Sequence, residues 1–184
     1  MNSRRLLTFI LVGLLPIAFM GQILDPAKLL EMPKDTWPTY NGDYSGRRYS
    51  PLSQINASNL RSLAMAWMYR TNTGSMRGVA RVQIKSTPLE VNGILYFTVP
   101  DHVWAVDGRT GEELWHYGWV DHGGHLLGNR GVGMYGSWLY FLGPDGWFIS
   151  LNAKDGTERW KIQVADAKLQ YFTTMAPMVV GNHV

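Results

Sequence analysis

The sequence contains no cysteine, so it forms no disulfide and offers no thiolate to a metal ion. Charge is also scarce: the formal net charge is +3, and it is only 15 − 14 = +1 without Arg4 and Arg5, which belong to a predicted targeting segment. No basic stripe follows them, so we predict no nucleic-acid partner. A phosphate loop with its lysine, an H-E-x-x-H pair and a Ser-His-Asp pattern are missing too, which argues against those catalytic classes.

Aromatic side chains are plentiful by contrast. Eight Trp and nine Tyr in 184 residues argue against disorder and indicate one packed domain. We expect this domain to occupy residues 35–184, because the chain begins with a short charged and apolar targeting segment.

The first residues, 1–21, have the pattern of a targeting segment. Two arginines precede a fifteen-residue apolar run from Leu6 to Met20, which is short for a membrane span and typical of a secretory signal peptide. No clean A-x-A cleavage site occurs, so an uncleaved N-terminal anchor remains the alternative. In either case we expect the folded part to be exported and to lie in the periplasm.

A repeat organises the rest of the chain. The segments AVDGRTGEELWHY from Ala105 and SLNAKDGTERWKI from Ser150 each predict a strand, a polar turn ending in glycine and a second strand with a tryptophan, and the copies are 45 residues apart. Another strand precedes each copy, GILYFTV at Gly93 and SWLYFLG at Ser137. TTMAPMVVGNHV resembles KSTPLEVNGIL and indicates the start of a third repeat. Short strands at this period predict the blades of a β-propeller.

The repeated tryptophans, Trp115 and Trp160, are expected to pack between neighbouring blades rather than to bind a ligand. A closed ring needs at least about four blades. Since the sequence holds two repeats and the start of a third, we predict a partial propeller, the N-terminal portion of a larger one.

Three stretches together resemble the quinoprotein alcohol and glucose dehydrogenases, from about Trp37 to the last residue. They are WPTYNGDYSGRRYSPLSQINASNLRSLAMAW, IKSTPLEVNGILYFTVPDHVWAVDGRTGEELWHY and GNRGVGMYG. The resemblance implies an all-β, eight-bladed propeller with pyrroloquinoline quinone (PQQ) near its axis and Ca²⁺ beside it. It also implies a periplasmic enzyme that oxidises an alcohol or a sugar by hydride transfer to PQQ. Electrons would then pass to a cytochrome c or to membrane quinone.

The same resemblance assigns Arg130 to the quinone oxygens. A guanidinium is always charged and presents a planar fork of donors, which suits adjacent carbonyl and carboxylate oxygens. The glycines beside it would let the backbone pass close to the ring, whereas the alternative is a solvated loop arginine. Thr174 matches a threonine that hydrogen-bonds the cofactor, and Thr173 is its rival.

Three further positions depart from the family pattern or are less specific. Lys85 stands where many members carry Glu or Gln, and it would either pair with a PQQ carboxylate or face solvent. Gly124 and His125 occupy the positions of two adjacent cysteines found in many alcohol-oxidising members. His125 would stack on the quinone or be an ordinary loop histidine.

The family's calcium ligands and catalytic Asp match positions after Val184, so we predict no catalytic residue and no metal ligand in this chain, and an inactive fragment. Asp101, Asp121 and Asp145 are turn residues and are not assigned as bases. The alternative function is a non-catalytic propeller module that binds proteins in the cell envelope.

Overall fold

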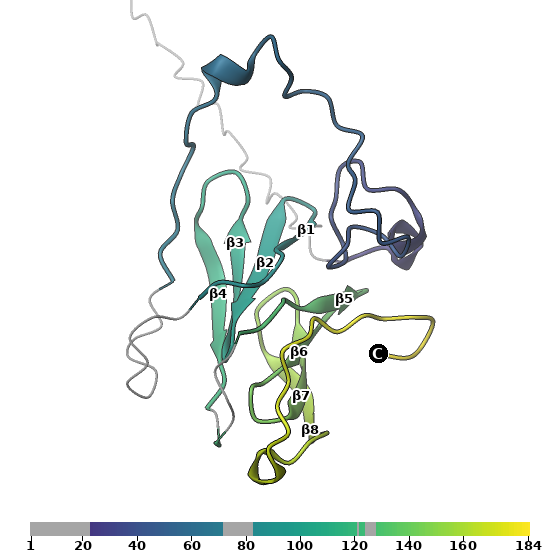
Figure 1. Cartoon of the computed structure of the whole chain (residues 1–184), viewed down its shortest axis with the longest axis vertical. Coiled ribbons are helices and arrows are strands. Elements are labelled where there is room, and N and C mark those ends of the chain that lie inside the picture. The colour runs from purple at the N-terminus through teal and green to yellow at the C-terminus, as the bar shows by residue number, and fades with distance from the viewer. Residues whose placement is uncertain (1–22, 72–82, 121, 124–127) are drawn as a thin grey trace, which may run out of the picture.

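The computed structural model describes residues 23–71, 83–120, 122–123 and 128–184 (Figure 1). Their strands form two four-stranded antiparallel sheets, each a meander in chain order. The first sheet contains β1 (Leu89–Val91), β2 (Ile94–Val99), β3 (His102–Asp107) and β4 (Glu113–Gly118). The second contains β5 (Gly133–Tyr135), β6 (Trp138–Leu142), β7 (Trp147–Asn152) and β8 (Glu158–Gln163).

Short 3₁₀ helices lie outside the sheets: η1 (Pro26–Leu30), η2 (Leu60–Ser62) and η3 (Ala167–Leu169). Within the described ranges, no helix has the length and apolar character needed to cross a membrane. The predicted targeting segment, 1–21, lies outside the described residues.

The predicted repeat is confirmed, since β3 and β7 begin 45 residues apart, at His102 and Trp147. The β3–β4 and β7–β8 pairs even share a register shift, just after Ala105 and just after Ser150. In β2 the expected alternation of buried and half-buried residues runs as far as Thr98. Each sheet is therefore one blade, and the all-β partial propeller expected from the sequence is present.

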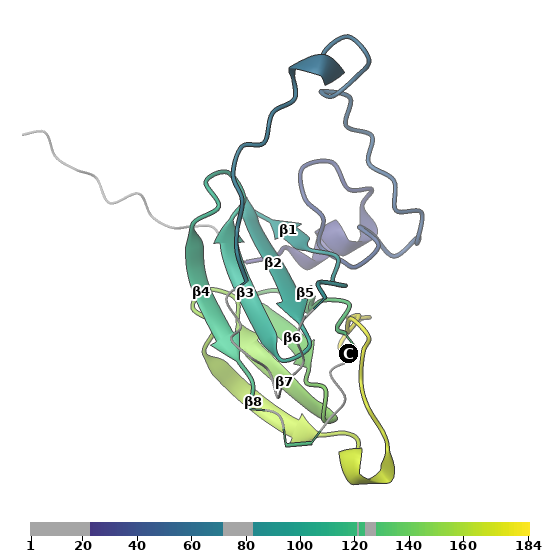
Figure 2. The same cartoon turned by 60° about the vertical axis from the view of Figure 1, so that its left-hand side comes forward.

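The two blades stack face to face (Figure 2), and their facing side chains form one core. Trp115 of β4 lies in this core, and its indole N–H donates to the Ala153 carbonyl of the second blade at 3.0 Å. The ring covers Gly156, where a Cβ would come within 2.6 Å of it. The predicted packing of Trp115 between blades is thus confirmed. The core also contains Leu89, Tyr96, Val103, Met134, Leu139, Phe141, Ile149 and Leu151.

Trp67 repeats this arrangement one step earlier in the chain. Its indole N–H donates to the Gly108 carbonyl at 3.2 Å, and its ring covers Gly111, where a Cβ would lie 2.7 Å away. The sequence repeat did not include Trp67, so the structure extends the series by one member. Trp160 packs against Tyr140 and Phe148 of its own sheet. The described residues form no third blade, so its predicted packing between blades stays a prediction.

The chain before the first blade, residues 23–71, is here called the arm. Its first part packs on the blades even ahead of the expected domain start at residue 35: Leu24 N–H bonds the Gly136 carbonyl at 2.9 Å, and Leu29 is buried. Trp37 then pairs with Glu90 through backbone hydrogen bonds of 2.7 and 3.1 Å. Residues 51–66 are exposed and arch away from the sheets with η2 (Figure 1).

The end of the chain starts another hairpin, as the sequence predicts. Val180 bridges to His183 across a Gly-Asn turn, just as Val91 pairs with Ile94 across an Asn-Gly turn. Val180–His183 is the only pairing of this last hairpin among the described residues.

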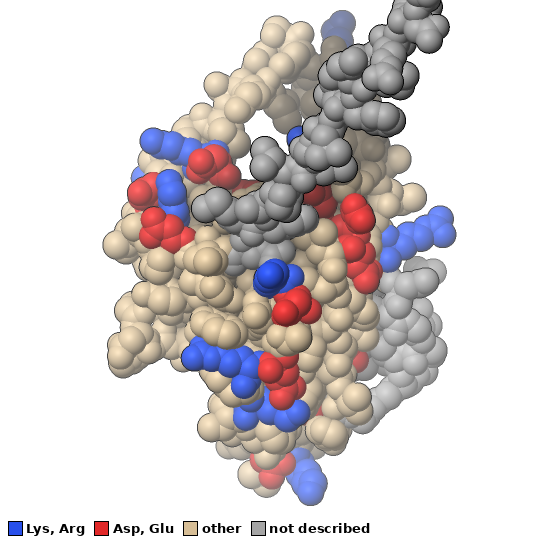
Figure 3. All heavy atoms as spheres, turned by 180° about the vertical axis from the view of Figure 1, so that it is seen from behind, with Lys and Arg blue, Asp and Glu red and all other residues tan. Residues whose placement is uncertain are grey.

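Charged side chains of both signs lie next to one another on the face seen in Figure 3, without a separate patch of either sign. The described ion pairs include Lys28–Glu31 and Lys161–Glu158, both at 3.1 Å. A nucleic-acid surface needs a one-signed patch, which the described residues of this face do not present.

Candidate cofactor site

One hollow of about 270 Å³ is lined by residues from three separate stretches of the chain: Lys85, Gly128, Arg130, Phe172 and Thr174. Three of the five residues predicted to bind the cofactor, Lys85, Arg130 and Thr174, therefore lie together. The other two, Gly124 and His125, lie outside the described residues. Phe172 and Gly128 were not predicted from the sequence.

The lining of this hollow is cationic. Lys85 and Arg130 contribute two positive charges, and none of the five lining residues is acidic. Phe172 is 47% exposed and adds an apolar surface beside them. The donor set therefore suits an anionic, partly aromatic ligand with carboxylate or quinone oxygens.

Thr174 holds the guanidinium of Arg130. Nη1 of Arg130 donates to Thr174 Oγ1 at 2.8 Å and to its carbonyl at 3.3 Å, while the backbone N–H of Arg130 bonds the same carbonyl at 3.1 Å. All side-chain hydrogen bonds of Arg130 within the described residues use Nη1, so the rest of its fork can serve a ligand. The rival Thr173 instead donates its hydroxyl to the Gly143 carbonyl.

The glycines around Arg130 serve contacts within the protein. Gly128 and Gly131 have φ angles of +136° and +128°, which L side chains rarely adopt. A Cβ on Gly128 would lie 2.6 Å from Lys85 Cδ, and one on Gly131 would lie 3.1 Å from the Thr87 carbonyl oxygen. The sequence predicted glycines here so that the backbone could approach the PQQ ring. The structure adds a second reason, because the aliphatic stem of Lys85 lies over the loop.

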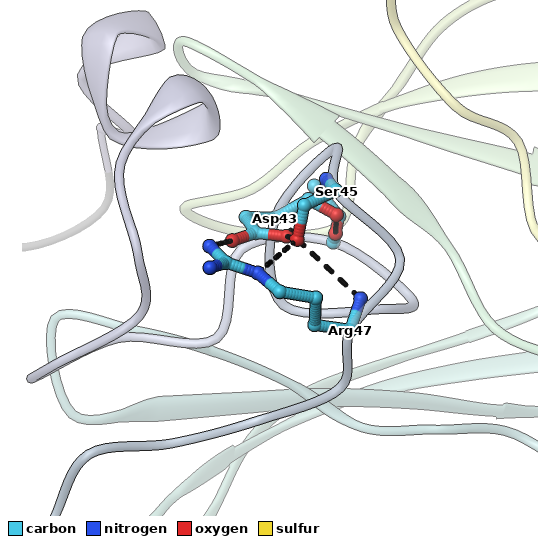
Figure 4. Close-up of polar contacts among 4 residues, drawn as sticks. Asp43, Ser45 and Arg47 are labelled. Carbon is cyan, nitrogen blue, oxygen red and sulfur yellow. Dashed lines mark hydrogen bonds and ion pairs between the residues drawn. The ribbon is translucent and has the colours of Figure 1, made fainter.

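The arm contributes a structured turn, which Figure 4 shows. Asp43 is buried, and its carboxylate accepts from Ser45 N–H at 2.8 Å and from Arg47 Nη2 at 3.2 Å. These hydrogen bonds, chiefly that of Ser45, lower the pKa of Asp43. The turn leads directly into Arg48, whose φ is +53° and whose Nη2 donates to Thr87 Oγ1 at 3.2 Å.

Thr87 links the arm to the hollow, because its backbone N–H donates to the Arg130 carbonyl at 3.1 Å. The guanidinium of Arg48 also lies over the ring of Tyr40, 4.9 Å from its centroid. The part of the sequence that carries the family resemblance before the repeats is thus physically joined to the loop of Arg130.

The aspartates that the sequence did not favour as bases lie elsewhere. Asp145 is 2% exposed and accepts the indole N–H of Trp119 at 2.9 Å and the backbone N–H of His122 at 2.8 Å. Asp101 is buried and lies 3.5 Å from His102 Nε2. Neither carboxylate lines the hollow, and Asp121 lies outside the described residues.

A pair of histidines beside Asp101 was not anticipated. His116 Nε2 and His102 Nδ1 share a hydrogen bond of 2.8 Å, and His116 stacks on Trp104 with ring centroids 4.6 Å apart. Burial lowers the pKa of both imidazoles. Among the described residues no group of three or more His, Cys, Asp or Glu side chains is arranged to hold a metal ion.

Known proteins are similar to this chain in sequence and in fold. The chain is 36% identical over 179 residues to quinohemoprotein alcohol dehydrogenase ADH IIB of Pseudomonas putida, covering 92% of this chain and 25% of that protein. It is 40% identical over 156 residues to the quinohemoprotein alcohol dehydrogenase of Comamonas testosteroni, covering 80% and 21%. The solved structure of quinohemoprotein alcohol dehydrogenase ADHIIG from Pseudomonas putida HK5 matches with a TM-score of 0.74 at 29% identity, covering 87% of this chain and 24% of that one.

These comparisons do not favour the alternative of a non-catalytic module. The chain spans about a quarter of the length of the relatives that it matches. A sequence profile for the PQQ β-propeller domain of glucose/ethanol/alcohol dehydrogenases matches residues 37–137, which include most of the arm, the first blade and Arg130. The chain therefore belongs to the PQQ-dependent glucose/ethanol/alcohol dehydrogenase family and forms part of its β-propeller.

Proposed function

We propose that this chain supplies the arginine side of the cofactor site in a periplasmic PQQ-dependent dehydrogenase that oxidises an alcohol. The observation that carries the proposal is that Lys85, Arg130 and Thr174 meet around one hollow, and that none of its described lining residues is acidic. When bound, PQQ accepts the hydride from the substrate carbon, while the protein provides binding, orientation and electrostatics.

The residues present fit that cofactor. Arg130 offers a planar set of donors to adjacent oxygens on one edge of the quinone, and Thr174 keeps the guanidinium in place through Nη1. With PQQ bound, the fixed positive charge of Arg130 would stabilise negative charge on a quinone oxygen. Lys85 supplies a second cation for a carboxylate, held near the loop by contact of its stem with Gly128.

Substrate and acceptor are proposed from the relatives. The three relatives named above are all alcohol dehydrogenases, which favours an alcohol over a sugar. Their names also denote a haem, which favours a cytochrome as electron acceptor over membrane quinone. The resemblance also implies Ca²⁺ and a catalytic Asp, and the proposal assigns neither role to a described residue.

The test is PQQ reconstitution of the full-length protein with Ca²⁺. Quenching of tryptophan fluorescence reports binding, and dye reduction with a panel of primary alcohols and aldoses reports turnover. We expect Arg130→Ala to lower turnover about 10²-fold, as removal of a charge-stabilising donor does in other enzymes. Arg159→Ala is the matched control, because Arg159 lies over the ring of Trp138 in the second blade and does not line the hollow.

Two outcomes would refute the proposal. A well-folded protein that fails to bind PQQ would leave Arg130 as a loop arginine. Equal turnover in the Arg130→Ala and Arg159→Ala proteins would remove the assigned role of Arg130.

A further inference from the structure

Asn129, directly before Arg130, has a buried side chain whose amide oxygen and amide nitrogen are both hydrogen-bonded. It is 1% exposed. Its Oδ1 accepts from Thr98 Oγ1 at 2.7 Å and from the backbone N–H of Gly131 at 2.8 Å, and its Nδ2 donates to the Leu142 carbonyl at 2.9 Å. These contacts are all made to other parts of the chain, so the residue acts within the protein.

The chemistry of its partners fixes which way the amide points. The N–H of Gly131 only donates and the carbonyl of Leu142 only accepts, so Oδ1 faces Gly131 and Nδ2 faces Leu142. Thr98 must then donate to Oδ1. A single side chain therefore needs both acceptor and donor atoms in one plane, which neither an ionised aspartate nor a hydroxyl residue provides.

These bonds tie the loop to both blades. Thr98 lies in β2 of the first blade and Leu142 lies in β6 of the second. The bond from Gly131 N–H back to Asn129 spans Arg130 and closes a tight turn around it. These bonds hold the backbone of Arg130 at the junction of the two blades, independently of the contacts of its guanidinium.

We propose that Asn129 is a positioning residue: its carboxamide fixes the backbone of Arg130 between the blades so that the guanidinium can meet the cofactor. This inference rests on the proposed function, in which Arg130 contacts PQQ. The inference goes beyond that function because it names the side chain that sets the position of Arg130. It also predicts that Asn129 and Arg130 act as one unit.

A double-mutant cycle on the full-length protein tests the coupling, with PQQ affinity measured by quenching of tryptophan fluorescence. We expect Asn129→Ala to weaken PQQ binding about tenfold when Arg130 is present, since residues that act as a unit couple by about 1–2 kcal/mol. In the Arg130→Ala background the same change should weaken binding less than about twofold. Thermal unfolding of all four proteins is measured alongside.

Milder variants keep the test usable if Asn129→Ala folds poorly. Thr98→Val removes the hydroxyl that donates to the carboxamide oxygen at nearly constant volume, and Thr98→Ser keeps it. We expect weaker PQQ binding for Thr98→Val and near wild-type binding for Thr98→Ser. Asn152→Ala is the control, because Asn152 accepts from Lys154 N–H in the β7–β8 turn and should lose stability without losing PQQ affinity.

The outcomes separate the two proposals. If PQQ binding does not need Arg130, the proposed function fails and the inference fails with it. If Arg130→Ala weakens binding but Asn129→Ala acts equally in both backgrounds, only the inference fails, and Asn129 merely stabilises the fold.

Discussion

Replacing Gly156 by alanine tests how the blades are joined. Gly156 lies in the β7–β8 turn with φ of +71°, and an added Cβ would stand 2.6 Å from Trp115 Cε3. Two non-bonded carbon atoms cannot approach so closely, so the ring of Trp115 must move. Its N–H then leaves the Ala153 carbonyl, to which it donates at 3.0 Å in the wild-type protein.

The cost of this change has three parts. A left-handed backbone costs an alanine about 1–2 kcal/mol. Overpacking costs about 1–3 kcal/mol, and losing the indole hydrogen bond costs about 1 kcal/mol. We therefore expect the free energy of unfolding to fall by about 4 kcal/mol for Gly156→Ala. Gly111→Ala should behave alike, because it places a Cβ 2.7 Å from Trp67 at φ of +76°.

Gly93→Ala isolates the backbone part. Gly93 has φ of +82°, but nothing lies within 4 Å of the position that an added methyl group would take, so only about 1–2 kcal/mol should be lost. Guanidinium unfolding followed by tryptophan fluorescence measures all three proteins. Equal midpoints for Gly156→Ala and Gly93→Ala would show that Trp115 does not lie against Gly156.

Two further predictions concern Asp145 and the His102–His116 pair. Asp145→Asn places an amide N–H group against either the indole N–H of Trp119 or the backbone N–H of His122, so we expect unfolding to become easier by about 2 kcal/mol in denaturant titrations, and no change would contradict the buried contact. Burial lowers the pKa of His102 and His116 below 6.5, although Asp101 and Glu113 oppose this for His116. The unfolded chain thus binds more protons, and stability present above 6.5 is lost as pH falls through the lowered pKa values. The melting temperature should fall less on acidification in the His102→Gln/His116→Gln protein; equal slopes would refute this.

Much of the fold could be predicted because blades are local structures. The turn glycines and alternating strands of each repeat lie within a few residues of their partners, so their pattern is visible in the sequence. Trp67 was missed because its partner, Gly111, is 44 residues further on and no repeat-like glycine turn precedes Trp67. The spacing of Trp67, Trp115 and Trp160, by 48 and then 45 residues, was the signal that could have identified it.

The site could be predicted only in part, because its residues are far apart along the chain. Arg130 and Thr174 are 44 residues apart, and only the resemblance to a family, not local pattern, brought them together before the structure did. Asn129 belongs to the same short motif as Arg130, yet its partners, Thr98 and Leu142, lie in two different blades. A buried carboxamide cannot be distinguished in sequence from a loop asparagine, because the difference lies entirely in what surrounds it.

The position of Arg130 depends on both blades. The Arg130 carbonyl accepts from Thr87 before the first blade, and the Arg130 N–H donates to Thr174 after the second. The preceding Asn129 is bonded to one strand of each blade, so no single blade can place the guanidinium. The blades must first be joined, and the joint depends on Trp115 over Gly156. Cofactor affinity and blade packing are therefore linked through geometry, although no atom of Trp115 lines the hollow.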